Sequence, residues 1–242
     1  MYVSWSNRGL RALSFALAAF LALPAFSGAE SPAYVPALPA SERFLYTRTV
    51  GDKVDEVEVR DRLVTDKGAT WLEVTSRSAE QDILLRLDPV TLFAVHVEVT
   101  SRGKDATLRR VTTVLENRLV PGPEDFVLSS FESLPYSLRA FPWGVRQKSK
   151  ITFLGSGASV PGFGFDLTVT GKETIAVAGR DIECWKAQLS LAGLLGAFVG
   201  KSSLWYSVEY PHFLVKTDGS SGPGTPRSVL TLVGFSSGSK AE

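Results

Sequence analysis

The residues that most often carry catalysis or bind metals are few in this chain and lie far apart in the sequence. Its 242 residues include two histidines, His96 and His212, and a single cysteine, Cys184. Neither histidine has a cysteine, a second histidine or a carboxylate at a spacing typical of zinc sites. The cysteine stands beside Trp185 in a strand-like run, where the usual role is that of a small buried residue. We therefore predict no metal site and no cofactor.

A serine between two glycines is the nearest approach to a nucleophile motif. Gly155-Ser156-Gly157 lacks the Gly-x-Ser-x-Gly spacing of the strand-to-helix elbow that exposes a catalytic serine. The chain also lacks a glycine-rich phosphate loop between a strand and a helix. We therefore predict no catalytic residue and a protein that is not an enzyme. The alternative is an active site that combines His96 or His212 with a carboxylate far away in the sequence.

Three acidic residues lie close enough in sequence to act as a pair of acid–base carboxylates. Glu56, Glu58 and Asp61 occur in one run, in which valines alternate with charged residues. Such alternation is typical of a strand with one wet face, and charged side chains also protect sheets from edge-to-edge aggregation. Paired catalytic carboxylates would instead have to flank a substrate in a cleft. We therefore assign all three acids to the outer face of a strand.

Alternation of apolar and polar residues with a period of two dominates the rest of the chain and predicts strands throughout. Turn-forming residues such as Asp66-Lys67-Gly68 separate the runs at short, even intervals. Short strands joined in this way form an antiparallel meander, which curls into a barrel or half-barrel. We expect strands at residues 44–50, 54–64, 70–76, 83–87, 92–101, 107–116, 150–154, 164–170, 174–177, 182–189, 204–207, 213–217 and 229–235.

One segment has the features of a helix. Residues 124–134 follow Pro123 and begin with two acidic residues, Glu124 and Asp125, which suit the N-terminus of a helix. Pro135 then marks the end of the segment. The predicted fold class is therefore mainly β, with an antiparallel meander curled into a barrel or half-barrel and one short helix.

The N-terminus has the pattern of a secretory signal peptide. Arg8 and Arg11 precede an uncharged apolar run at residues 12–26, and small residues follow at the positions expected for cleavage after Ala29. The run is shorter than the roughly 20 residues that span a bilayer, and Pro24 interrupts it near its end. We therefore expect a protein that is exported to the periplasm and keeps no transmembrane anchor after cleavage.

The predicted organisation has four parts, namely the signal peptide at residues 1–29, a proline-rich extended leader at 30–42, a single β domain at 43–236 and a polar tail at 237–242. Residues 1–29 hold two of the 26 basic residues and none of the 25 acidic ones, so the mature chain is close to neutral. A near-neutral chain without a basic run has no electrostatic footprint for nucleic acid or anionic lipid. We therefore expect no nucleic-acid partner.

The chain carries a set of short motifs, which are Asp88-Pro89-Val90-Thr91-Leu92, Asp125, Ser129, Leu138-Arg139, Gly144, Glu173, Val177-Ala178-Gly179, Leu204-Trp205-Tyr206-Ser207 and Pro211-His212. Together they resemble an uncharacterised family of exported bacterial β-proteins, over most of the mature chain. The resemblance implies a β meander, a short helix and a C-terminal Trp-Tyr-Ser strand, and it supplies no catalytic residues. The architecture is more distantly similar to the half-barrels of periplasmic lipoprotein carriers, a likeness of fold alone.

Two uncharged, glycine-rich segments in the C-terminal half are the strongest candidates for a binding site. Residues 151–165 and 191–199 contain no charged side chain. They belong either to the core or to the border of an apolar cavity on the concave side of the sheet, where glycines would let the border move. Without a charge to hold a polar ligand, such a cavity would suit an acyl chain or a similar lipid-like group. The predicted ligand-binding residues are Phe163, Phe165, Leu191, Leu194, Leu195, Phe198 and Val199.

These observations predict an exported, non-enzymatic periplasmic β-domain that binds an apolar or lipid-like ligand. The alternative is a structural or assembly partner in the cell envelope that binds no small molecule. Its contact surface would be an exposed sheet edge or the hairpin at residues 219–226. A co-purified lipid would favour the first function, and a protein partner recovered by crosslinking in intact cells would favour the second.

Overall fold

One thirteen-stranded sheet contains most of the residues that the structure describes. The structure is a computed structural model, and it describes residues 38–102, 108–114, 125–128, 130–153, 164–193, 200–220 and 226–238. The predicted signal peptide and residues 30–37 of the predicted leader lie outside the described residues. The elements are β1 (Ser41–Val50), β2 (Lys53–Asp66), β3 (Ala69–Arg77), β4 (Gln81–Leu87), β5 (Ala94–Arg102), β6 (Leu108–Val114), β7 (Asp125–Leu128), α1 (Leu134–Ser137), the 3₁₀ helix η1 (Leu138–Ala140), β8 (Lys148–Phe153), β9 (Gly164–Val177), β10 (Arg180–Leu191), β11 (Ser202–Ser207), β12 (Leu214–Ser220) and β13 (Arg227–Gly238).

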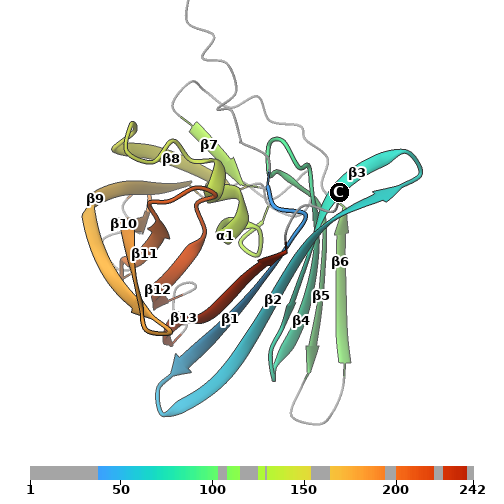
Figure 1. Ribbon diagram of the computed structural model, residues 1–242, viewed down its shortest axis with the longest axis horizontal. Helices are drawn as coiled ribbons and strands as arrows, with labels where there is room; N and C mark the ends of the chain where they lie inside the picture. The colour runs from blue at the N-terminus through green and yellow to red at the C-terminus, as the bar shows by residue number, and fades with distance from the viewer. Residues whose placement is uncertain are drawn as a thin grey trace, which may run out of the picture. The chain divides into compact units, whose positions relative to one another are not determined.

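Strands β1 to β6 lie side by side in chain order. On its other edge β1 pairs with β13, and β13 to β7 then lie side by side in reverse chain order. The pairing of β7 with β8 is parallel, and the other pairings are antiparallel. Among the described residues no pairing joins β6 to β7, so the sheet is open, and it curves around α1 (Figure 1). The predicted fold class, a mainly β meander curled into a half-barrel with one short helix, is confirmed.

Alternation along β1 and β2 gives the sheet one packed face and one solvated face. Phe44 and Tyr46 of β1 pair with Val59 and Val57 of β2, and all four side chains are buried. Charged residues such as Glu58 occupy the intervening positions on the other face. Because successive side chains of a strand point to opposite faces, this pattern packs one face of β1 and β2 and leaves the other in water.

Glycines mark two places where the chain departs from regular strands. The predicted turn at Lys67 and Gly68 joins β2 to β3, and both residues have positive φ, 50° and 82°, as a two-residue hairpin turn of this kind requires. Residues 164–170 and 174–177, predicted as two strands, form the single strand β9. Gly171, with a φ of 146°, lies where the register between β9 and β10 shifts, so a bulge replaces the expected break.

The helix lies later in the chain than the sequence predicted, so the predicted helix at residues 124–134 is wrong. Asp125–Leu128 forms β7, which pairs with β8, and α1 begins only at Leu134. Pro135 does not end the helix but occupies its first turn. Proline fits there because an N–H in the first turn has no acceptor within the helix, so its loss costs no hydrogen bond.

Two apolar clusters make up the core, and the helical segment formed by α1 and η1 contributes to both. Tyr136 belongs to a cluster that contains Phe44, Val74 and Leu85 with other residues of β1 to β5, and also residues of β9 to β13. Leu138 belongs to the cluster built on β8 to β12, which also contains Phe141, Trp143, Ile151 and Tyr206. Because it contributes to both clusters, the helical segment connects two halves of the curved sheet.

No helix within the described ranges is long and apolar enough to cross a membrane.

Candidate functional site

An apolar pocket of about 280 Å³ lies between the helical segment and the packed face of the sheet. We call it the inner pocket. Its residues come from β1 to β4, from the segment that contains α1 and η1, and from β12, β13 and the turn before β12. They are Phe44, Tyr46, Val57, Val59, Val74, Ser76, Gln81, Ile83, Leu85, Phe131, Glu132, Pro135, Tyr136, Arg139, Phe213, Leu214 and Leu230.

The walls of the inner pocket are held in place by regular strand pairing. Val74 of β3 faces Leu85 of β4 across the sheet, and each side chain is only 1% exposed. Opposite them, the ring of Phe213 lies 5.7 Å from the ring of Phe44. Strands fix the positions of these side chains better than loops would, so the pocket has rigid apolar walls.

Arg139 of η1 brings the one cation among the described lining residues, and two buried carboxylates bind it. Its Nη2 lies 2.7 Å from Oε2 of Glu42 in β1, and its Nη1 lies 3.3 Å from Oδ2 of Asp61 in β2. All three side chains are at most 7% exposed. We call this group the buried triad, and it ties the helical segment to the first two strands.

The hydrogen bonds of the buried triad are incomplete within the described part of the chain. Nε of Arg139 and Oδ1 of Asp61 are buried, and neither has a hydrogen-bond partner there. A buried polar atom without a partner costs free energy, because it has lost its contacts with water. An additional polar group that formed a hydrogen bond with either atom would therefore lower the free energy of the buried triad.

Asp61 corrects the prediction that three acids lie on the outer face of one strand. Glu56 is exposed, and Glu58 lies on the outer face with Arg43 and Arg60, as predicted. Asp61 is instead 2% exposed, because it shares the strand face of Val57 and Val59 and finds its counterion in Arg139. The pKa of Asp61 is raised to about 7, because burial and, to a smaller extent, the charge of Glu42 raise it more than Arg139 lowers it.

Two tyrosines of the inner pocket lie near the buried triad. The hydroxyl of Tyr46 donates to the carbonyl oxygen of Leu214 at 2.9 Å and so links β1 to β12. Burial raises the pKa of both Tyr46 and Tyr136, so each phenol stays protonated at neutral pH. The polar floor of the pocket thus consists of neutral hydroxyls beside a guanidinium whose charge is balanced.

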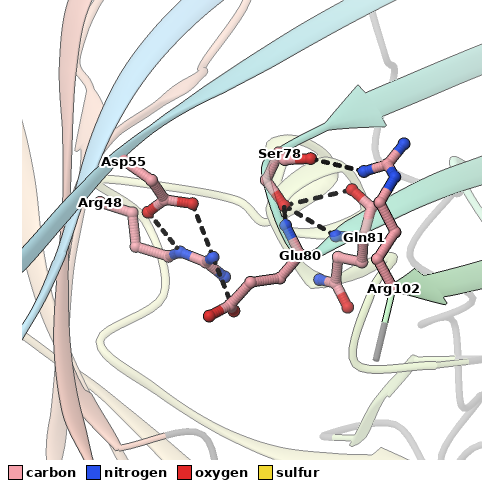
Figure 2. A network of polar contacts seen from close by, with 6 residues as sticks. All are labelled: Arg48, Asp55, Ser78, Glu80, Gln81 and Arg102. Atoms are coloured by element: carbon pink, nitrogen blue, oxygen red, sulfur yellow. Dashed lines mark hydrogen bonds and ion pairs between the residues drawn. The ribbon is translucent and has the colours of Figure 1, made fainter. Parts of the chain in front are cut away.

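A polar network borders the inner pocket at Gln81. Figure 2 shows Arg48 bound to Asp55 through two hydrogen bonds of 2.9 and 2.7 Å, while its Nη2 also lies 2.9 Å from Glu80. The hydroxyl of Ser78 donates to the carbonyl oxygen of Gln81 at 3.1 Å (Figure 2). Here one guanidinium serves two carboxylates, so this side of the pocket also carries no excess of positive charge.

The residues predicted from sequence to bind a ligand lie mostly outside the described part of the chain. These are Phe163, Leu194, Leu195, Phe198 and Val199. Phe165 and Leu191 are described and pair with each other across β9 and β10, but the inner pocket does not include them. The ring of Phe165 lies 5.4 Å from that of Phe131, which does line the pocket. Phe165 therefore lies next to a lining residue, and the ligand-binding role of all seven residues stays a prediction.

The two histidines and the cysteine lie in three separate places, His96 in β5, Cys184 in β10 and His212 just before β12. Nδ1 of His212 lies 2.8 Å from the carbonyl oxygen of Ser207, and burial lowers the pKa of the imidazole. Cys184 is buried as predicted, and its burial raises the pKa of the thiol to about 12, which disfavours the reactive thiolate. In the described ranges no three His, Cys, Asp or Glu side chains form a group that could hold a metal ion.

Sequence reasoning missed the inner pocket and the buried triad. Asp61 continues the parity of Val57 and Val59, so its inward direction could have been read from the alternation itself. Arg139 and Glu42 are 97 residues apart, and no local pattern connects them. The lining residues of the pocket likewise come from distant segments, which only the curvature of the sheet brings together.

Comparisons with known proteins give structure neighbours alone. No protein-family model matches the chain, and no curated protein matches it. The hypothetical lipoprotein YmcC from Escherichia coli matches with a TM-score of 0.34 and 16% identity, over 84% of this chain and 89% of that one. A DUF1329 family protein from Desulfovibrio piger matches with a TM-score of 0.28 and 11% identity, over 84% of this chain and 88% of that one. A protein with a YmcC-like fold from Bacteroides fragilis matches with a TM-score of 0.32 and 10% identity, over 85% of this chain and all of that one.

Proposed function

We propose that this protein is an exported, non-enzymatic β-domain that binds a single apolar chain in the inner pocket. The observation that carries the proposal is the composition of the pocket walls, which consist mainly of aliphatic and aromatic side chains from both halves of the curved sheet and from the helical segment. Such a pocket with few polar groups is the usual form of a site for an apolar small molecule.

The size of the pocket favours one chain over a lipid with several. Its volume of about 280 Å³ lies near the lower end, roughly 300 Å³, of the pockets that hold small molecules. At roughly 25 cal/mol per Å² of apolar area, a ligand that buries about 200 Å² would gain on the order of 5 kcal/mol. The entropy lost on association reduces this gain, which leaves a modest affinity suited to a carrier or sensor.

The polar groups around the pocket support binding better than catalysis. The guanidinium of Arg139 and the carboxylates of Glu42 and Asp61 are committed to one another. Catalysis by proton transfer would need a group within hydrogen-bond reach of a bound substrate and free to exchange its proton. Export rests on the N-terminal pattern at residues 1–29, which gives the periplasm as the proposed location.

The proposal is tested by titrating the exported protein with the neutral fluorescent probe N-phenyl-1-naphthylamine. Ile83, a half-buried lining residue, is replaced by tryptophan to fill the pocket. We expect Ile83→Trp to weaken probe binding by about tenfold or more, because the ring occupies the ligand's space. Val54→Trp, at an exposed position of β2, serves as the control and should bind like the wild type. Absence of saturable binding to the wild type would refute the proposed function.

A further inference from the structure

We propose that the inner pocket selects apolar chains with an uncharged oxygen-bearing end, such as an alcohol, ester or amide, against the corresponding carboxylate and amine. This inference rests on the proposed function and names the ligand class of the same site. It follows from the way charges are arranged at two polar regions, the lining residue Arg139 with its carboxylate partners Glu42 and Asp61, and the network beside Gln81.

The floor presents a buried donor that lacks an acceptor. Arg139 lines the pocket, and its Nη1 and Nη2 are bound to Asp61 and Glu42. Its Nε is buried and has no hydrogen-bond partner among the described residues. An oxygen atom of a ligand that reached Nε would restore the missing hydrogen bond. The floor is therefore suited to a ligand with a hydrogen-bond acceptor at its end.

The charge of the triad decides which acceptor is favourable. One guanidinium is matched by the two carboxyl groups of Glu42 and Asp61. A carboxylate that entered would lose its hydration and would gain little, because the positive charge of Arg139 is already balanced. An ammonium group would lose its hydration as well, and it has no lone pair with which to accept a hydrogen bond from Nε. An uncharged oxygen accepts the same hydrogen bond at a much smaller desolvation cost.

The other polar side of the pocket offers no better place for an anion. Arg48 is shared between Asp55 and Glu80, and this group adjoins the lining residue Gln81 (Figure 2). Glu132, also a lining residue, adds a negative charge to the pocket lining. Among the described residues, a fatty acid would therefore find no unbalanced cation near Gln81 to hold its carboxylate. Both polar regions disfavour a carboxylate, and at Arg139 an ammonium group is disfavoured because it cannot accept a hydrogen bond.

The test measures displacement of N-phenyl-1-naphthylamine from the full exported protein by decanol, decanoate and decylammonium at pH 8. We expect decanol to compete with an inhibition constant about tenfold lower than those of the two charged compounds. Equal or tighter competition by decanoate or decylammonium would overturn the inference while the proposed function stands, and so would failure of decanol to displace a bound probe. If the probe itself does not bind, the proposed function fails first.

A charge variant separates the effect of the pocket from the lower solubility of decanol. Glu132→Lys places a cation among the lining residues, and we expect it to strengthen decanoate binding about threefold relative to decanol binding. Glu56→Lys makes the same change of charge at an exposed position on the outer face of β2 and should change neither affinity. Unchanged decanoate binding in Glu132→Lys, or an equal gain in Glu56→Lys, would contradict the inference.

Discussion

The guanidinium of Arg139 lies 2.7 Å from the carboxylate of Glu42, a residue 97 positions earlier in the chain. This contact joins the helical segment to β1, and the contact of Arg139 with Asp61 extends the link to β2. On the other side, the hydroxyl of Tyr206 in β11 lies 3.3 Å from the carbonyl oxygens of Leu134 and Pro135. The helical segment is thus fastened to both halves of the curved sheet, and it forms one wall of the inner pocket.

Loss of Arg139 should destabilise the fold strongly. Arg139→Met leaves Glu42 and Asp61 buried without a cation, and breaking a buried ion pair in this way costs about 3–5 kcal/mol in the free energy of unfolding. Urea denaturation measures the change. Arg227→Met removes an exposed arginine that binds Asp218 and should leave the denaturation midpoint nearly unchanged. Equal stability of Arg139→Met and the wild type would show that the buried triad does not hold the helical segment.

Replacing the whole triad should restore much of the stability that Arg139→Met loses. In the triple variant Glu42→Met, Asp61→Leu and Arg139→Met, no charge is buried without a partner, and apolar side chains fill the space. Such replacements are often neutral or stabilising by about 1–4 kcal/mol relative to the ionic original. The triple variant should therefore unfold at a higher urea concentration than Arg139→Met. A triple variant less stable than Arg139→Met would show that stability at these sites depends on the packing of the original side chains and not on the pairing of their charges.

Asp61 should make stability depend on pH. Its pKa is about 7 in the folded protein and about 3.9 in an unfolded chain, so between these values the folded state binds one more proton. The contribution of Asp61 to stability is therefore largest below about pH 4 and decreases as the pH rises toward 7. Asp61→Asn removes this dependence, so its stability relative to the wild type should rise from pH 4 to pH 7.5. If the curves of unfolding free energy against pH were parallel for Asp61→Asn and the wild type, the raised pKa of Asp61 would be contradicted.

Substitution of Gly144 should be destabilising through both backbone strain and a steric clash, and Gly51 allows the two effects to be measured separately. Its φ is 81°, and a Cβ added there would lie 2.8 Å from Cζ2 of Trp185. Gly51 has a φ of 58°, but a Cβ there would meet nothing within 4 Å. Gly51→Ala should cost about 1–2 kcal/mol from backbone strain alone. Gly144→Ala should cost about 1–3 kcal/mol more, because the indole must move. Equal losses in the two variants would show that Trp185 adapts freely.

Strand positions could be read from the sequence because they depend on local alternation. Val57 and Val59 alternate with Glu56 and Glu58, and the turn at residues 66–68 follows, so the first hairpins were predicted nearly in place. Bulges are harder to foresee, because one extra residue changes which face the next side chain occupies. The register shift opposite Arg86 and Leu87 buries both Ala94 and Val97, which simple alternation places on opposite faces.

The candidate site could not be predicted in the same way, because its chemistry arises from contacts between distant segments. The rings of Phe213 and Phe44, from distant parts of the chain, have centroids 5.7 Å apart, and Arg139 finds its carboxylates in β1 and β2. The helix predicted at residues 124–134 is wrong for a related reason, because pairing of β7 with β8 outweighs the local helical features of this segment. The uncharged segments differ from the rest of the chain in composition, whereas the inner pocket is lined mainly by strands whose sequences show the same alternation as the other strands.

Photo-crosslinking tests the central claim most directly, that the inner pocket is the ligand site. A decanol analogue with a diazirine near the end of its chain is bound to the exported protein, activated by light and located by mass spectrometry after proteolysis. We expect label on wall residues such as Ile83, Phe213 and Leu230, and loss of that label in Ile83→Trp. Label confined to residues 163–165 and 191–199, or to the outer face of the sheet, would contradict the claim.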